Sequence, residues 1–191
     1  MHLHRVMTNI TETRPQYVAG TWKADPTHTK ISFTVKHLMI SKVRGTFDAF
    51  DVTIVTADDP HNSTIEAVID VASVNTGQPD RDNHLRTSDF FLVEEHPTMT
   101  FRSTALHADG DDFSVEGDLT LRGVTKPVTL KGELGGIITD PYGLTRAGAT
   151  ATTTINRHDF GVSWNAAIEA GGMTLGDNVK IEIDIEVVLQ S

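Results

Sequence analysis

The chain has 191 residues, 38% of them hydrophobic and 22% charged, values that are ordinary for one soluble globular domain. A formal net charge of -10 argues against a nucleic-acid partner and against docking on anionic lipid through a basic patch, because both require positive surface charge. The absence of cysteine excludes disulfides, thiolate metal ligands and a cysteine nucleophile.

The first 17 residues, "MHLHRVMTNITETRPQY", lack the apolar core of a signal peptide. No run in the sequence approaches the roughly 20 apolar residues that a membrane-spanning helix needs. We therefore expect a flexible segment over residues 1–17 and a single domain over residues 18–191. We also expect a cytoplasmic location and no stable insertion into a membrane.

Apolar and polar residues alternate along most of the domain, and this period of two is typical of strands with one buried face. The clearest runs are "KISFTVKH" (30–37), "FSVEGDLTL" (113–121) and "IEIDIEV" (181–187). Weaker runs cover residues 18–24, 46–56, 64–71, 98–107, 126–134 and 146–156. Turn-forming residues separate them at 57–63, 108–112, 135–143 and 176–178. The pattern predicts an all-β antiparallel fold, and a closed barrel is favoured because an open sheet would expose two edges.

One stretch, "RDNHLRTSDFF" (81–91), breaks the alternation. It predicts a short helix over residues 80–88, with Asp80 as its cap and an Asp82–Arg86 pair four residues apart. Leu85 is the only aliphatic residue on this helix, so its apolar face is narrow. A short helix that interrupts a barrel usually covers one end, so we expect a lid near the barrel mouth.

The same stretch raises the possibility of acid–base catalysis, because His84 lies close in sequence to Asp82 and Asp89. The residues are equally typical of ion pairs and caps on an exposed helix. No G-x-S-x-G nucleophile motif, phosphate loop or dinucleotide fingerprint accompanies them. Catalysis is therefore the weaker interpretation.

The chain contains 9 histidines, which raises the question of a metal site. Outside the N-terminal segment none of them shows H-E-x-x-H or H-x-H spacing, so we expect no metal, although strands can bring distant histidines together. His37 ends the apolar face of its strand. A buried imidazole needs a hydrogen-bond partner, so His37 is either a satisfied core residue or a contact for a ligand.

The apolar faces predict a set of inward side chains that either fill a solid core or line a cavity, since a barrel of about eight strands can hold one small ligand. The alternation does not separate these two interpretations. The set comprises Phe33, Val35, Phe47, Phe50, Val68, Phe101, Leu119, Leu130 and Trp164, with Phe47 preferred over Phe50 as the inward residue of its pair.

Five blocks of the sequence, taken in order, resemble the YceI-like family of polyisoprenoid-binding proteins. The blocks are "WKADPTHTKISFTVKHLMISKVRGTFDAF", "RDNHLRTSDFFLVEEHPTMTFRS", "GDLTLRGVTKPVTL", "INRHDFGVSWN" and "LGDNVKIEIDIE", which together span about residues 20–189. The resemblance implies a lipocalin-like antiparallel barrel of eight strands with a helical element over its mouth. It also implies that the interior holds a long apolar chain, such as a polyprenyl or quinone tail or a fatty amide. Many members are exported, and this sequence differs from them in showing no signal peptide.

These observations lead to one functional interpretation and two rivals. We expect a non-enzymatic carrier for a long-chain isoprenoid or related amphiphilic lipid, with no cofactor and with a homodimer as an open possibility. The rivals are a lipid hydrolase or isomerase that uses His84 with Asp82 or Asp89, and a protein-interaction module. The expected ligand-binding residues are Phe33, Val35, His37, Phe47, Arg81, His84, Leu85, Phe90, Phe91, Phe101 and Trp164. Arg86, His28 and Arg157 are further polar candidates, the last two of which are equally compatible with structural roles.

Overall fold

A computed structural model describes residues 16–166 and 174–191 of the chain. Most of the predicted flexible segment, residues 1–15, lies outside the described residues. The strands are β1 (Gly20–Ala24), β2 (Lys30–His37), β3 (Ser41–Phe47), β4 (Phe50–Thr56), β5 (Thr64–Asp70), β6 (Val74–Asn75), β7 (Thr98–Asp109), β8 (Asp112–Leu121), β9 (Val124–Thr139), β10 (Thr145–Asn156) and β11 (Leu175–Leu189). The helix α2 (Pro79–Leu85) is accompanied by 3-10 turns at Pro26–His28, Pro60–Asn62, Val71–Ser73 and Arg157–Phe160.

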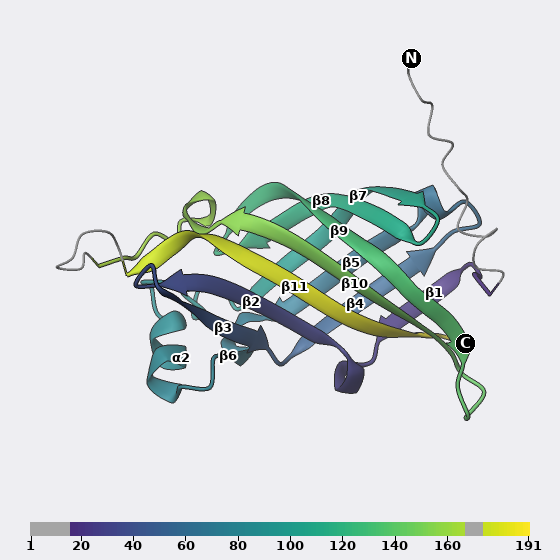
Figure 1. Ribbon diagram of the computed structural model, residues 1–191, viewed down its shortest axis with the longest axis horizontal. Helices are drawn as coiled ribbons and strands as arrows, with labels where there is room; N and C mark the ends of the chain where they lie inside the picture. Colours follow the sequence, from purple (N-terminus) through teal and green to yellow (C-terminus); the bar gives the residue numbers. More distant parts are fainter. Residues whose placement is uncertain (1–15, 167–173) are drawn as a thin grey trace, which may run out of the picture.

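The strands form a closed antiparallel barrel, as predicted (Figure 1). Eight strands make the ring in the order β1-β4-β5-β7-β8-β9-β10-β11, and β1 closes it by pairing with β11. The long strand β11 changes partner along its length, because residues 187–189 pair with β1 and residues 175–184 pair with β2. The strands β2, β3 and β6 therefore extend the wall at one end, and α2 lies beside β3 and β6 at this end, opposite the C-terminus.

The inward and outward faces follow the alternation on most strands. On β8 the apolar residues of the alternation, Val115, Leu119 and Leu121, are all buried, as predicted for Leu119. The prediction is wrong for Val68, whose side chain is 47% exposed, because Ile65, Ala67 and Ile69 form the inner face of β5. An unbroken apolar run such as "AVI" does not show which of its residues face inward.

Three predicted boundaries need correction. The run predicted over residues 46–56 is divided between the end of β3 and β4, and most of β3 was missed. The expected turn at 135–143 is much shorter, since β9 continues to Thr139. The expected turn at 176–178 lies within β11, where the pairing with β2 is irregular between Leu175 and Val179. In β9 and β11 the hydrogen bonds between strands outweigh the local turn preference of glycine, and the pairing with the neighbouring strand is locally irregular.

The centre of the barrel is filled by a layer of apolar side chains from β7 and β8, which we call the middle layer: Phe101, Val115 and Leu119. All three are buried. Phe101 pairs across the strands with Leu119, and its ring occupies the space above Gly117, where a Cβ would collide with it. The glycine therefore provides the volume that the aromatic ring fills.

A second apolar cluster lies toward the end of the barrel where β1 and β11 close the ring. Trp22, Ile137 and Val187 are its buried members. Tyr17, which was expected in the flexible segment, packs against this cluster, and its hydroxyl donates a 2.7 Å hydrogen bond to the carbonyl of Ala57. Tyr17 therefore packs as part of the barrel domain.

The helix α2 differs in detail from its prediction. It begins at Pro79 and ends at Leu85, and the side chain of Gln78, not Asp80, caps it by accepting from the backbone N–H of Arg81. The predicted Asp82–Arg86 ion pair is not formed. Asp82 is 7% exposed and accepts hydrogen bonds from the backbone N–H and hydroxyl of Thr76 at 2.9 and 2.5 Å.

The other half of that expected pair, Arg86, makes different contacts. It donates to the carbonyls of Ala72 and Val74. Long-range backbone acceptors therefore take the place of the local ion pair, and the two charged residues fasten α2 to the segment that precedes it.

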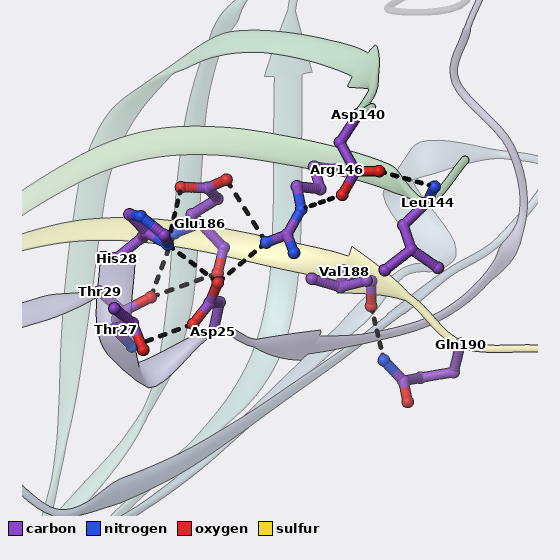
Figure 2. Close-up of polar contacts among 10 residues, drawn as sticks. All are labelled: Asp25, Thr27, His28, Thr29, Asp140, Leu144, Arg146, Glu186, Val188 and Gln190. Carbon is purple, nitrogen blue, oxygen red and sulfur yellow. Dashed lines mark hydrogen bonds and ion pairs between the residues drawn. The ribbon is translucent and has the colours of Figure 1, made fainter. Parts of the chain in front are cut away.

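A cluster of charged side chains marks the point at which β11 changes partner (Figure 2). Arg146 of β10 contacts Asp25 at 2.9 Å, Asp140 at 2.7 Å and Glu186 at 3.5 Å. His28 lies 2.9 Å from Asp25. Hydrogen bonds from His28 and then Arg146 lower the pKa of Asp25 from 3.8 to about 2, and the hydrogen bond to Asp25 raises the pKa of His28. The cluster joins β1, β10, β11 and the β9–β10 turn at the seam of the barrel.

We expect the Arg146→Met variant to be less stable than the wild type at neutral pH and to unfold at a higher pH on acidification. Because the pKa of Asp25 falls from 3.8 to about 2 on folding, its stabilising contribution is complete above its unfolded value and is lost as the pH falls toward 2. Without Arg146 this pKa rises, so the loss begins at higher pH. Urea unfolding measured at a series of pH values checks this. Arg102→Met, which removes an exposed pair with Glu66, is the control and should unfold as the wild type does.

Candidate functional site

The candidate site is an apolar cavity of about 290 Å³ inside the barrel, at the end that carries α2. Its walls come from β2, β3, β7, β8, β10 and β11, and residues of α2 and of the segments after α2 and after β10 cover it. The described lining residues are Phe33, Val35, His37, Val43, Phe47, Arg81, His84, Leu85, Phe90, Phe91, Met99, Leu121, Ile155, Arg157, Val162, Trp164, Thr174, Leu175, Val179 and Ile181. No carboxylate belongs to this set.

Aromatic rings form two contact groups around the cavity. The ring of His84 meets those of Phe90 and Trp164 edge to face, each at a centroid distance of 5.0 Å. Phe47 lies 5.5 Å from Phe33 and 5.9 Å from Phe91. Such contacts are favourable beyond the area they bury, so they hold α2 and the segment after it against the barrel.

The turn after α2 places the two phenylalanines of the "DFF" sequence at the cavity. The backbone N–H of Phe91 donates to the carbonyl of Leu85, and that of Phe90 donates to Thr87. Helix geometry therefore ends at Leu85, three residues before the predicted boundary at 88, because the chain must turn back toward the barrel. The expected lid consists of both the helix and this turn.

The structure brings together every predicted ligand-binding residue except Phe101. Phe101 is buried at 7% exposure in the middle layer and is not among the described lining residues of this cavity. The choice of Phe47 over Phe50 agrees with the geometry, since Phe47 is buried and lines the cavity, whereas Phe50 is partly buried and packs on the core. His37 also borders the cavity and is half-buried, so it is not a fully enclosed core residue.

The polar candidates separate into two groups. Arg81 borders the cavity, but its Nε and Nη2 atoms donate to the hydroxyl and carbonyl of Thr76 at 2.7 and 2.9 Å. Arg157, for which the sequence left a structural role open, is a lining residue of the cavity. His28 and Arg86 are not lining residues: His28 belongs to the charged cluster at the seam of the barrel, and Arg86 fastens the base of α2.

Several lining residues were not predicted. Val179 and Ile181 continue the inward alternation of β11, so the sequence contained a signal for them. Val43 belongs to β3, a strand missed because "SKVRGTF" mixes charges and glycine. Met99, Leu121 and Ile155 were on predicted strands, but only the strand register shows that they reach this end of the barrel.

The structure shows which carboxylate lies next to His84, the residue on which the catalytic alternative depends. His84 is paired with Asp89, whose carboxylate lies 2.7 Å from its Nε2, whereas Asp82 bonds to Thr76. Both members of the His84–Asp89 pair are over 40% exposed. The single hydroxyl among the described lining residues is that of Thr174, which donates to the carbonyl of Ala166 at 2.8 Å.

The described residues contain no group of three or more histidine, aspartate and glutamate side chains placed to hold a metal ion. Among the helices of residues 16–166 and 174–191, none is both long and apolar enough to cross a membrane.

A second apolar cavity of about 150 Å³ lies at the other end of the barrel. Leu106, Phe113 and Ile185 are among its lining residues. On both β7 and β8, the residues of the middle layer lie in sequence between those that line the first cavity and those that line the second. The middle layer therefore separates the two cavities. The barrel therefore encloses two apolar spaces along one axis.

Comparisons with known proteins agree with the architecture. A family model described as "YceI-like domain" matches residues 22–187. A UPF0312 protein of Staphylococcus aureus (strain N315) is 39% identical over 165 residues, which cover 85% of this chain and 94% of that protein.

Two solved structures share the fold at low sequence identity. BcnA of Burkholderia cenocepacia has a TM-score of 0.74 at 22% identity, over 85% of this chain and 98% of that one. A polyisoprenoid binding domain from Saccharophagus degradans, implicated in plant cell wall breakdown, has a TM-score of 0.68 at 17% identity, over 88% and 98%.

Proposed function

Because the chain belongs to the YceI-like family, we propose that it is a non-enzymatic carrier that holds a long-chain isoprenoid or related amphiphilic lipid in its barrel. The observation that carries the proposal is the 290 Å³ cavity, which has an apolar wall, an aromatic cover and no carboxylate among its described lining residues. The polyisoprenoid binding of the Saccharophagus degradans domain, named for that protein, supports the same ligand class here.

The physical basis of the proposed binding is the transfer of an insoluble chain from water to an apolar space. Each buried CH2 group contributes about 0.8 kcal/mol, so a chain of several isoprene units gains a large free energy even in a cavity with few polar contacts. The cavity volume of 290 Å³ lies near the lower end of the range of about 300–1,000 Å³ that is usual for ligand sites. The cavity therefore suits part of a long chain or the whole of a shorter one.

The proposal predicts that protein purified from cells carries a chain that organic solvent extracts after denaturation. Mass spectrometry of the extract identifies it. Protein freed of this chain should then take up an added polyprenol, followed through the fluorescence of Trp164, which lines the cavity. Finding no extractable chain and no uptake of polyprenols would contradict the proposal.

The His84–Asp89 contact is the specific observation that keeps a lipid hydrolase or isomerase as the second candidate. If the protein is a carrier, wild type incubated with a long-chain ester releases no acid. His84→Ala then weakens lipid binding only about two- to tenfold, through lost ring contacts. If the protein is an enzyme, wild type releases acid and His84→Ala abolishes this turnover while lipid binding persists.

The oligomeric state stays open, with a homodimer as one possibility. Sedimentation of the purified protein, with and without bound lipid, tests it. A partner protein that co-purifies after removal of the lipid would instead favour the interaction module.

A further inference from the structure

Arg157 is a buried cation at the edge of an apolar cavity. It follows β10, begins the 3-10 turn Arg157–Phe160, and is 4% exposed. It is also a lining residue of the 290 Å³ cavity, on the wall that β10 and β11 share with the segment 162–164. A charged guanidinium in such a place needs acceptors for its N–H groups, because burying an unpaired charge is costly.

Most of the guanidinium is satisfied by backbone carbonyls. Its Nε donates to Gly176 at 2.8 Å, and its Nη1 donates to Val162 at 2.9 Å and to Trp164 at 2.8 Å. These bonds tie the segment after β10 to the start of β11, which is the structural role of the residue. They also fix the guanidinium in one orientation.

The remaining nitrogen, Nη2, is buried and has no hydrogen-bond partner among the described residues. It is the one buried side-chain nitrogen or oxygen atom of residues 16–166 and 174–191 in this condition. Buried polar groups in folded proteins are almost always paired, so an orphaned donor on a residue that lines a cavity indicates an acceptor that the described residues do not supply.

The charge is also poorly compensated. All three carbonyl acceptors are neutral, and the described cavity lining has cationic or basic side chains (Arg81, Arg157, His37 and His84) but no carboxylate. Burial lowers the pKa of the Arg157 guanidinium, and Asp177 opposes this only through longer-range attraction. An anionic oxygen at Nη2 would supply both the missing acceptor and the missing charge.

We propose that Nη2 of Arg157 binds the carboxylate of a long-chain acid whose hydrocarbon part fills the cavity. The proposal rests on the proposed function and refines it, because it assigns the ligand an acidic head group and places that head on the β10–β11 wall. A carboxylate fits better than a pyrophosphate, since the two N–H groups of one free nitrogen match the two oxygens of a carboxylate, whereas a pyrophosphate needs more donors. The lid residue Arg81, which already donates to Thr76 from two nitrogens, is the less suitable partner.

The test compares two probes that share a chain and differ in the head group, hexadecanoic acid and hexadecanol, at about pH 7.5, where an alkyl carboxyl group is ionised. We expect the wild type to bind the acid at least about tenfold more tightly than the alcohol, since a hydrogen bond to a charged group is stronger than one to a neutral hydroxyl. Equal affinity for the two probes would overturn the assignment of the head group and leave the carrier proposal intact. Binding of neither probe would count against the carrier proposal itself.

Variants then locate the head group. Arg157→Gln should reduce the preference for the acid to about twofold or less while hexadecanol still binds, which shows that the barrel is intact. Arg102→Gln, at an exposed arginine on the outer face of β7, is the matched control and should keep the full preference. A preference for the acid that Arg157→Gln retains would overturn the proposal, whether or not Arg81→Gln loses that preference. If Arg157→Gln does not fold, the ratio of the two affinities in the wild type still decides the head group.

Discussion

Replacing Phe101 by alanine is expected to lower the free energy of unfolding by about 3–5 kcal/mol, the usual cost of removing a buried phenylalanine. Phe101 is central to the middle layer, where it pairs with Leu119 and fills the space above Gly117. The strands around it cannot collapse into the vacated volume, because the closed ring of hydrogen bonds holds them apart. The loss would be a large share of the about 5–15 kcal/mol typical of a domain.

The same change should alter ligand preference. Without the Phe101 ring the cavities of about 290 and 150 Å³ lose the side chain that lies between them, so longer chains should gain affinity relative to shorter ones. Urea unfolding gives the stability, and a series of polyprenols of increasing length gives the preference. Ile138→Ala, at an exposed position of β9, is the control and should change neither the stability nor the chain-length preference by much. An unchanged length preference in a folded Phe101→Ala variant would show that the middle layer does not limit the ligand.

Replacing Val35 by tryptophan should weaken the binding of a long-chain lipid by roughly hundredfold or more. Val35 lies on the inner face of β2 and lines the cavity, so an indole there occupies space that the ligand needs. Excluding about four CH2 groups from the cavity costs roughly 3 kcal/mol, which corresponds to about a hundredfold loss of affinity.

The stability of Val35→Trp should change by no more than about 1–3 kcal/mol, because the added ring enters a cavity and not a packed core. Val68→Trp is the matched control, with the same substitution on the outer face of β5, and should bind lipid like the wild type. Titration of lipid-free protein with a polyprenol measures both variants. Tight binding by Val35→Trp would mean that the lipid lies elsewhere than in the 290 Å³ cavity.

Much of the fold was predictable because it is a local property of the chain. A period of two marks a strand and its buried face, so β2, β8 and the centre of β11 could be recognised from their own residues. The block resemblance to the YceI-like family added the number of strands in the ring and the helix at its end. Where the local signal was weak, as in the glycine-containing β3 or the "AVI" run that includes Val68, the prediction failed.

The aromatic part of the site was also predictable, since Phe33, Phe47, Phe90, Phe91 and Trp164 all line the cavity. The exception, Phe101, shows what the alternation of apolar and polar residues does not predict. Alternation tells which face of a strand is buried, but it does not tell at which height along the barrel axis a residue lies. That height depends on the register between strands distant in sequence, and the register places Phe101 in the middle layer and Met99 at the cavity.

The sequence by itself therefore determined most of the strands, most of their inner faces and the class of fold, because neighbouring residues encode these properties. The tertiary structure alone decided which polar groups are satisfied. Asp82 bonds to Thr76 instead of Arg86, His84 pairs with Asp89, and Nη2 of Arg157, a lining residue of the cavity, has no partner within residues 16–166 and 174–191. Hydrogen-bond partners such as Gly176 for Arg157 meet only when the barrel closes, so no local pattern could have revealed them.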